Sequence, residues 1–308
     1  KHMSVLTVGS IALDDIKTPL AEHKNLLGGS ASYSAIAAAY FAPTRLVGIV
    51  GTDFPSEHIE LFKSKGIDVD GLEVADGETF RWSGEYHWDM NTRDTLSVAL
   101  NVFESFSPKL PAAYLDTPII LLANIAPALQ AHVLDQARLP KFSIADTMDL
   151  WIDTTRDDLV GLLARVDMLI LNDGEARQLT GETSLIKAGK AIRNMGPGYV
   201  AVKKGEHGCL LFGPEGQFFS CGAYPLEDIH DPTGAGDTFA GGLAGYIASK
   251  SDGEVSFDLL KSAVVYGSVL ATSNVEAFSC ERLRSLTLDE IETRLHSFRA
   301  MSQFEVLP

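Results

Sequence analysis

The chain has 308 residues, 45% of them apolar, so it can bury a large core in one or two domains, and intrinsic disorder is excluded. Its 41 acidic and 25 basic residues give a formal charge of −16, which repels polyanions, so we expect a small-molecule substrate rather than nucleic acid or a membrane surface as partner. The three cysteines form no C-x-x-C pair, which indicates neither a disulfide framework nor a cysteine-based zinc site and predicts a cytoplasmic protein.

Short apolar runs alternate along the chain with segments of helical period, the pattern that parallel β-α-β units produce. The predicted strands are Val5 to Gly9, Leu46 to Val50, Ile119 to Asn124, Phe142 to Asp146, Met168 to Asn172, Val200 to Lys203 and Cys209 to Phe212. The predicted helices carry apolar stripes at Leu129 to Ala137, Leu159 to Val166 and Leu185 to Met195, and the last helix begins with a capping box of Thr287 and Glu290. The fold class is therefore α/β with a mostly parallel sheet. We take Lys1 and His2, which precede Met3, as vector-derived residues.

One segment breaks this pattern. Residues 79–89 alternate strictly, so that four aromatic side chains share one face, and a second alternating stretch follows a turn at residues 91–94. The aromatic residues are Phe80, Trp82, Tyr86 and Trp88, and the second stretch carries Leu96, Val98, Leu100 and Val102 on one face. We predict an antiparallel hairpin whose aromatic face is buried. It packs flat on its own domain, closes over a ligand, or contacts a second copy of the chain.

The most specific motif is Asp231-Pro232-Thr233-Gly234-Ala235-Gly236-Asp237, which leads into a stretch of helical period. A Gly-Ala-Gly turn that opens a helix leaves backbone N–H groups unpaired at the positive end of the helix dipole, where they can hold a phosphate. Asp237 falls in the first helical turn, where its carboxylate can accept the proton of a hydroxyl that attacks phosphorus. Alternatively, Asp237 only caps the helix.

Further short motifs lie near the ends of predicted strands. Gly28-Gly29 precedes a helix of small residues from Ser30 to Phe41, and Asp14 follows the first strand. Asn172-Asp173-Gly174-Glu175 and Lys203-Lys204-Gly205-Glu206-His207-Gly208 each continue from a strand. Each motif alone is weak, since a glycine pair is usually an ordinary turn. Their position is informative, because open α/β sheets bind ligands at the carboxyl ends of strands.

In this order, the motifs resemble those of the ribokinase-like, or PfkB, carbohydrate kinase family, whose C-terminal signature is similar to residues 231–239. The resemblance implies one three-layer α/β/α ribokinase-like domain over residues 1–308, with a β-sheet lid from about residues 12–28 and 76–104. It also implies transfer of the γ-phosphate of ATP to a hydroxyl, with Mg²⁺ bound near the phosphates. The implied catalytic groups are the Asp237 carboxylate, as general base, and the N–H groups of Gly234, Ala235 and Gly236, as anion hole.

The same resemblance implies roles for other residues. The implied ATP-binding residues are Asn172, Glu175, Lys203, Gly205 and Gly208, with Glu175 meeting Mg²⁺ through water. Asp231 and the Thr233 carbonyl are candidates for a monovalent cation, K⁺, behind the anion hole. The candidate substrate-binding residues are Asp14, Gly28, Gly29, Tyr33, Arg93, Asn124 and Asp146. Tyr33 departs from the family pattern, since sugar kinases commonly carry Asn at that position.

The resemblance favours a sugar as acceptor. A nucleoside is the alternative, because Tyr33 and the aromatic hairpin could stack on a base. A non-catalytic sensor would be marked by loss of Asp237 or of the Gly-Ala-Gly turn, and both are present. A dinucleotide-dependent oxidoreductase would need a complete glycine fingerprint, which the sequence lacks. A homodimer through the lid would cover the aromatic face of the hairpin.

Overall fold

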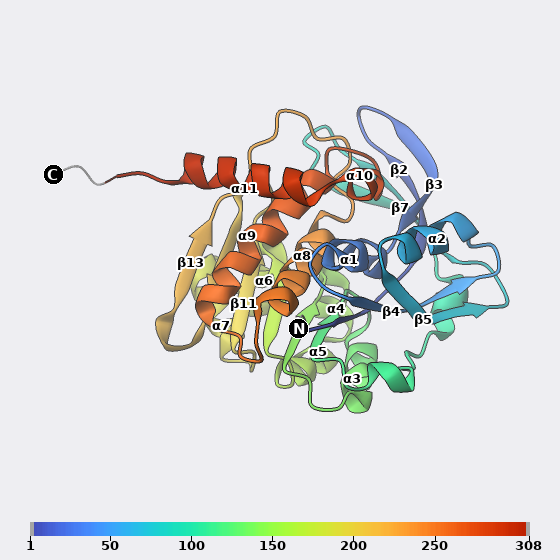
Figure 1. Cartoon of the computed structure of the whole chain (residues 1–308), viewed down its shortest axis with the longest axis horizontal. Helices are drawn as coiled ribbons and strands as arrows, with labels where there is room; N and C mark the ends of the chain where they lie inside the picture. Colours follow the sequence, from blue (N-terminus) through green and yellow to red (C-terminus); the bar gives the residue numbers. More distant parts are fainter. Residues whose placement is uncertain (1–2, 306–308) are drawn as a thin grey trace.

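Two β-sheets organise the chain, as the computed structural model of residues 3–305 shows (Figure 1). Lys1 and His2 lie outside the described residues. In spatial order, the main sheet consists of β13 (Phe218–Cys221), β12 (Cys209–Phe212), β11 (Tyr199–Lys203), β10 (Met168–Asn172), β9 (Phe142–Asp146), β8 (Ile119–Leu122), β1 (Val5–Val8), β4 (Thr44–Gly51) and β5 (Ile67–Ala75). Neighbouring strands run parallel except at the β11–β12 and β12–β13 pairs. All seven predicted strands are present, which confirms the α/β class.

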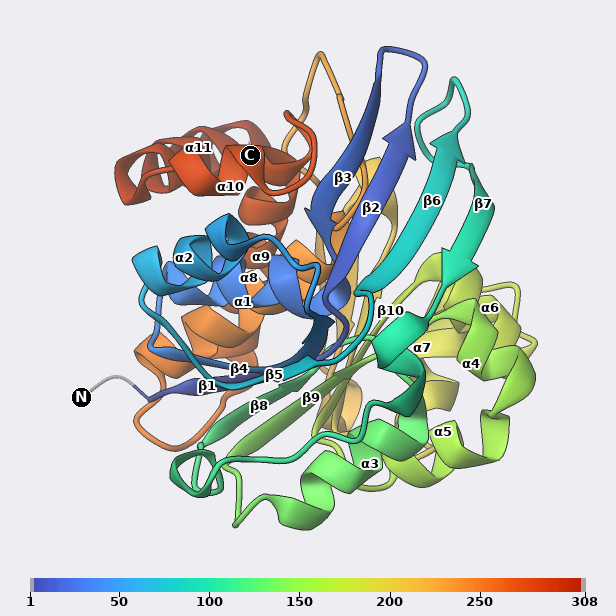
Figure 2. The ribbon, with the colours of Figure 1, turned by 90° about the vertical axis from the view of Figure 1, so that its right-hand side faces the viewer.

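Helices cover both faces of the main sheet (Figure 2). One layer contains α1 (Ser30–Ala39), α2 (Ser56–Ser64), α8 (Ala235–Lys250), α9 (Phe257–Asn274), α10 (Glu281–Ser285) and α11 (Leu288–Ser302). The other contains α3 (Pro127–Gln136), α4 (Asp149–Thr154), α5 (Arg156–Leu163), α6 (Asp173–Thr180) and α7 (Leu185–Arg193). The predicted capping box of α11 is confirmed, because Thr287 and Glu290 exchange both hydrogen bonds. Within residues 3–305, no helix has the length and apolar character needed to cross a bilayer.

A small sheet rises from one edge of this three-layer body (Figure 2). Its strands are, in spatial order, β3 (Glu22–Gly28), β2 (Ala12–Lys17), β6 (Phe80–Tyr86) and β7 (Arg93–Ala99). The central pair, β2 and β6, is parallel, and the outer pairs are antiparallel. The predicted hairpin is therefore confirmed as β6–β7. It is joined by β2 and β3, which come from the segment predicted to form the rest of the lid.

The aromatic face of this hairpin does not pack as one surface on its own domain. The ladder shifts register between Ser83 and Gly84, which leaves Leu96 without a partner and interrupts the alternation. Trp88 lies beyond the end of β6 and is 86% exposed, whereas Phe80 stacks on Phe103. Only part of the aromatic set therefore faces the interior.

The apolar residues predicted to share one face of the second hairpin strand, β7, do not all lie on that strand. β7 ends at Ala99, and Val102 lies in a 3₁₀ helix, η1 (Asn101–Ser105), where it joins the core of the main sheet. Leu96 and Val98 are 58% and 54% exposed, so β7 is an edge strand with an uncovered apolar surface.

The strand order places a topological switch point between β1 and β8. From β1 the chain builds outward to β4 and β5 on one side, and β8 to β11 follow on the other. Ligands of open α/β sheets bind at the carboxyl ends of strands at such a point. Ser30 lies there, at the start of α1, and its hydroxyl donates a hydrogen bond of 3.1 Å to the carbonyl of Asn124, just after β8.

Candidate active site

The turn before α8 has the open backbone that the sequence predicts. Gly234 precedes the helix in the left-handed conformation, with φ of 77°, and no side chain caps α8. The Ala235 N–H donates to the carbonyl of Pro232 over 3.2 Å, so this group stabilises the turn itself. The first helical turn beyond it keeps its N–H groups at the positive end of the dipole, which suits an oxyanion.

Asp237 lies in the first turn of α8. Burial raises the pKa of its carboxyl to about 7, Asp146 adds to the rise, and Lys203 and Arg93 oppose it. The absence of a side-chain cap on α8 argues against the alternative in which Asp237 only caps the helix. A carboxyl with a pKa near neutrality can exchange a proton with a hydroxyl efficiently.

Lys203 is a largely buried cation close to the first turn of α8. It ends β11, and its ammonium group lies 3.6 Å from the Asp146 carboxylate at the end of β9. A Cβ on Gly236 would lie 2.8 Å from the Lys203 nitrogen, so glycine permits this approach to the first turn of α8. Burial lowers the pKa of Lys203, but Asp146, Glu175 and Asp237 outweigh this effect and raise it, so Lys203 is charged at neutral pH.

Asn172 and Glu175 form a capping box at the start of α6. The Asn172 side chain accepts from the N–H of Glu175 over 2.8 Å, and the Glu175 carboxylate accepts from the N–H of Asn172 over 2.7 Å. Burial raises the pKa of Glu175 to about 7, while Lys203 lowers it. Both side chains therefore have a structural role and still lie beside Lys203, which approaches the first turn of α8.

The turn from β11 to β12 contains two of the predicted nucleotide-binding residues. Gly205 and Gly208 have positive φ, and a Cβ on Gly208 would overlap the carbonyl of Cys221 on β13. Lys203, Gly205 and Gly208 are thus neighbours along one strand and its turn.

The acceptor candidates Asp14 and Gly28 touch each other across the β2–β3 pair. A Cβ on Gly28 would overlap the Asp14 carboxylate, so a larger residue there would displace that carboxylate. Asp14 is buried and its Oδ1 has no hydrogen-bond partner among the described residues. Burial raises its pKa well above the usual value, and Asp231, Asp237 and Asp15 add to the rise. A buried carboxylate oxygen without a partner is rare in a native fold and fits a ligand hydroxyl.

Tyr33 links the acceptor candidates to the anion-hole turn. Its ring lies flat on Gly234, because a Cβ there would be 2.5 Å from three of its ring carbons. Its buried hydroxyl, like Asp14 Oδ1, has no partner among residues 3–305. Burial raises the pKa of Tyr33, and Cys280, Asp231 and Asp14 add to the rise. Gly29, the remaining glycine of the predicted pair, lies at the start of α1 with φ of 92°.

Two other acceptor candidates have partners within the protein. The Asn124 side-chain oxygen accepts from the indole N–H of Trp151 over 2.8 Å, and its amide nitrogen contacts the sulfur of Met148. Asp146 pairs with Lys203 rather than standing free at its strand end. Neither side chain offers an unpaired polar atom comparable to that of Asp14.

The predicted cation loop is held by internal hydrogen bonds. The two carboxylate oxygens of Asp231 accept from the N–H groups of Thr233 and Ser279, at 2.9 and 3.0 Å. The Thr233 carbonyl accepts from the Asn274 amide over 3.0 Å. Among residues 3–305, no three His, Cys, Asp or Glu side chains cluster as direct ligands of a metal.

Sequence reasoning missed the way Tyr86 reaches this site. The Thr233 hydroxyl donates to the Tyr86 hydroxyl over 3.0 Å, which connects the small sheet to the anion-hole turn. Arg93, opposite Tyr86 in the β6–β7 ladder, lies 5.8 Å from the ring centre of Trp82. Periodicity placed Tyr86 on a buried face but contained no signal for a contact 147 residues away.

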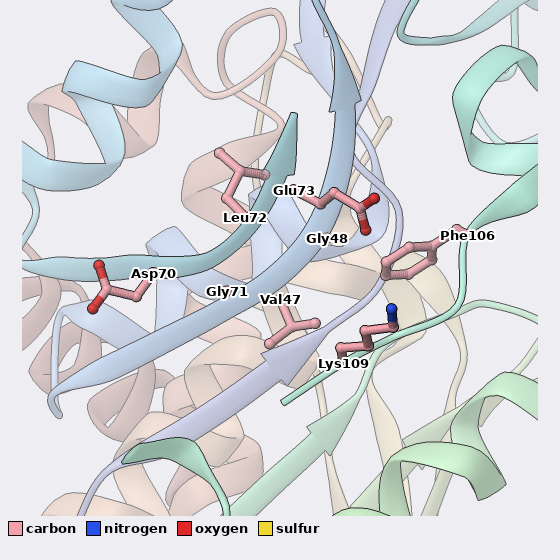
Figure 3. Close-up of a pocket in the computed structure, with 8 residues that line it drawn as sticks. All are labelled: Val47, Gly48, Asp70, Gly71, Leu72, Glu73, Phe106 and Lys109. Carbon is pink, nitrogen blue, oxygen red and sulfur yellow. The ribbon is translucent and has the colours of Figure 1, made fainter. Parts of the chain in front are cut away.

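Two surface hollows lie on other parts of the described chain or at the margin of this site. One, of about 140 Å³, lies along β4 and β5 and is lined by Val47, Gly48, Asp70, Gly71, Leu72, Glu73, Phe106 and Lys109 (Figure 3). It shares no residue with the candidate site. The other lies between the tips of the two hairpins and is lined by Lys17, Thr18, Pro19, Glu85, Tyr86, His87, Trp88 and Asp94. Tyr86 therefore borders both that hollow and the turn before α8.

Comparisons with known proteins identify a family. The family model described as pfkB family carbohydrate kinase matches residues 8–281. A cytidine kinase of Thermococcus kodakarensis is 29% identical over 250 residues, which cover 79% of this chain and 88% of that protein. A nucleoside kinase of Methanothermobacter thermautotrophicus is 27% identical over 263 residues, which cover 78% and 81% of the two chains.

A solved structure has the same fold. A putative ribokinase II of E. coli in complex with ATP and Mg²⁺ superposes with a TM-score of 0.76 at 19% identity, over 96% of this chain and 99% of that one. The predicted ribokinase-like fold is thereby confirmed.

Proposed function

Because the chain belongs to the pfkB family of carbohydrate kinases, and is therefore a phosphotransferase, we propose that it transfers the γ-phosphate of ATP to a ribose hydroxyl of a nucleoside. The nucleoside replaces the sugar that the sequence favoured. It is supported by the cytidine and nucleoside kinases among the relatives, each of which matches most of its length.

The observation that carries the proposal is the pair of unpartnered polar atoms beside the anion-hole turn. Asp14 Oδ1 and the Tyr33 hydroxyl are buried without a partner in the described chain, and the Tyr33 ring contacts Gly234. A ligand with adjacent hydroxyls can donate to the carboxylate and pair with the phenol, which satisfies both atoms. The same ligand would then lie beside Asp237.

The chemistry follows from these positions. Asp237 accepts the proton of the acceptor hydroxyl as the hydroxyl oxygen bonds to the γ-phosphorus. The bond from that phosphorus to the bridging oxygen breaks, and its electron pair leaves with ADP. The N–H groups of Gly234, just before α8, and of Gly236, in its first turn, stabilise charge on the transferring group together with the Lys203 ammonium. Arg93, on the hairpin opposite Tyr86, opposes the raised pKa of Asp237 and so adds positive charge to the surroundings of that carboxyl.

The residues present also fit a nucleotide with Mg²⁺. Mg²⁺ usually keeps several waters and takes one or two carboxylates together with substrate phosphates. Glu175, buried but engaged by the capping box, suits such a contact through water, with Asn172 beside it. Bound Mg²⁺ would neutralise phosphate charge. Asp231 and the Thr233 carbonyl remain the candidates for a monovalent cation.

The small sheet supports a base as part of the acceptor. Trp82 is the direct neighbour of Asp14 in the parallel β2–β6 ladder, so both side chains lie on the same face of the small sheet. Its ring is half-buried and covers Gly84, where a Cβ would overlap the ring. An aromatic surface beside a hydroxyl-binding carboxylate suits a molecule with both a base and a sugar.

We also propose that the small sheet acts as the predicted lid and that its edge pairs with a second copy of the chain. β7 presents unpaired backbone groups together with the exposed side chains of Leu96 and Val98. Such an edge favours pairing with an identical strand.

The experiment is ADP release from Mg-ATP across a panel of nucleosides, free pentoses, hexoses and sugar acids, with Asp237→Asn as the matched inactive variant. We expect release with nucleosides and a loss of about 10² to 10⁴ in rate on substitution. Release only with free sugars would return the acceptor to the sugar class. Near-full activity of Asp237→Asn would contradict its role as the base.

A further inference from the structure

The hydroxyl of Tyr86 connects the β6–β7 hairpin of the small sheet to the turn before α8. Tyr86 ends β6 and is buried, and its hydroxyl accepts a hydrogen bond of 3.0 Å from the Thr233 hydroxyl in the anion-hole turn. The tip of the hairpin extends away from the main sheet (Figure 2). The Tyr86 side chain, at the end of β6, therefore contacts the turn before α8 from a position close to the tip of the hairpin.

Thr233 is a fixed point for such an attachment. Its N–H donates to Asp231, and its carbonyl accepts from Asn274 on α9. Asp231 is in turn held by the N–H of Ser279. The turn is therefore anchored to the helical layer, and the hydrogen bond to Tyr86 attaches the hairpin to it.

Arg93 depends on the same attachment. It lies directly opposite Tyr86 in the ladder, next to the ring of Trp82. Burial raises the pKa of the Tyr86 hydroxyl, and the Arg93 guanidinium opposes that rise, as it does at Asp237. Within residues 3–305, Arg93 forms no ion pair with a carboxylate. Its place beside Trp82 and opposite Tyr86 is thus set by the hairpin.

We propose that Tyr86 is a positioning residue that latches the β6–β7 hairpin onto the turn before α8 through Thr233, and so fixes Arg93, its neighbour across the ladder, relative to that turn. The inference rests on the proposed kinase function. When the latch is closed, the hairpin excludes water from the transferring phosphoryl group. Without the latch, the hairpin opens more often, and ATP is hydrolysed as well as transferred.

The first test is hydrogen exchange of the full chain without substrate. Tyr86→Phe keeps the ring and removes the hydroxyl, and Thr233→Val removes the other partner. We expect each to speed exchange of residues 80–99 by about two- to tenfold, as for loss of one hydrogen bond. The double variant should exchange no faster than either single variant. Tyr266→Phe is the matched control, because it loses a surface hydrogen bond to Glu292 between α9 and α11.

The second test measures ADP against phosphorylated acceptor. The wild-type protein should form equal amounts, whereas Tyr86→Phe should form more ADP than product, with kcat about two- to tenfold lower and KM for ATP unchanged. Unchanged exchange in the hairpin, or equal ADP and product in Tyr86→Phe, would overturn the latch. If the wild-type protein phosphorylates no acceptor, the kinase proposal fails, while the exchange measurement still decides whether the hydroxyl fastens the hairpin.

Discussion

The anion-hole turn and the β6–β7 hairpin meet at one hydrogen bond, yet they are built in opposite ways. The turn is enclosed by α8, α9 and the Tyr33 ring, and Asp231, Thr233 and Asn274 hold its backbone. The hairpin is an edge of the small sheet, and its outer strand is exposed along its whole length. Under the proposed function, the chemistry takes place on the rigid element, and the looser element controls access and substrate choice.

Substitution of Gly234 by Ala should have the largest effect on the turn. Alanine at φ of 77° is strained, and its Cβ would press on the Tyr33 ring at 2.5 Å. We expect the free energy of unfolding to fall by about 2 to 4 kcal/mol, with activity lost in the fraction that remains folded. Urea denaturation measures the change.

Gly161→Ala is the matched control for that prediction. Gly161 lies on the exposed side of α5, and a Cβ there would meet nothing. Alanine should stabilise the helix by about 0.5 to 1 kcal/mol. Equal stability of the two variants would show that the turn is less constrained than its contacts indicate.

The pH dependence of activity and of stability tests Asp237 in the same turn, and we expect an effect smaller than that of Gly234→Ala. The pKa of Asp237 is raised from 3.8 to about 7, mainly by burial, so the folded state disfavours its carboxylate form. Catalysis needs that form, so kcat/KM should fall about tenfold per pH unit below about 7. Stability has the opposite sign, because the contribution of this group is fully present below pH 3.8 and is lost as the pH rises through about 7.

Asp237→Asn separates these two expectations. The variant should be nearly inactive yet have a higher melting temperature than wild type at pH 8, since it no longer buries a charge beside Asp146. A lower melting temperature at pH 8 would show that the Asp237 charge is stabilised by Lys203 more strongly than burial penalises it.

The same contrast explains what the sequence could predict. Buried strands of the main sheet are short apolar runs, so all seven predicted strands were found, whereas β5 was missed because Asp68, Asp70 and Glu73 give this edge strand a polar pattern. In the hairpin, the register shift at Ser83 could not be predicted, because alternation is visible in a sequence but a bulge is not.

In the candidate site as well, some features could be predicted from the sequence and others could not. The Gly-Ala-Gly turn and Asp237 form one continuous motif, and the sequence located them directly. The contact of Tyr33 with Gly234 and the pair of Lys203 with Asp146 join residues far apart in the chain. Only the fold brings these side chains together, so their partners could not be predicted from spacing.

The exposed edge of the hairpin provides the prediction with the smallest effect on the folded chain. Leu96→Lys with Val98→Lys places two charges on a surface that is already more than half exposed. The stability of the monomer should therefore change by no more than about 0.5 kcal/mol per site. If β7 pairs with a second copy, light scattering should give a dimer mass for wild type and a monomer mass for the double variant. Val160→Lys on α5 is the matched control and should keep the wild-type mass, since it is exposed on a helix of the main body. A monomer mass for wild type at all concentrations would contradict the paired edge and leave the exposed strand to serve the lid alone.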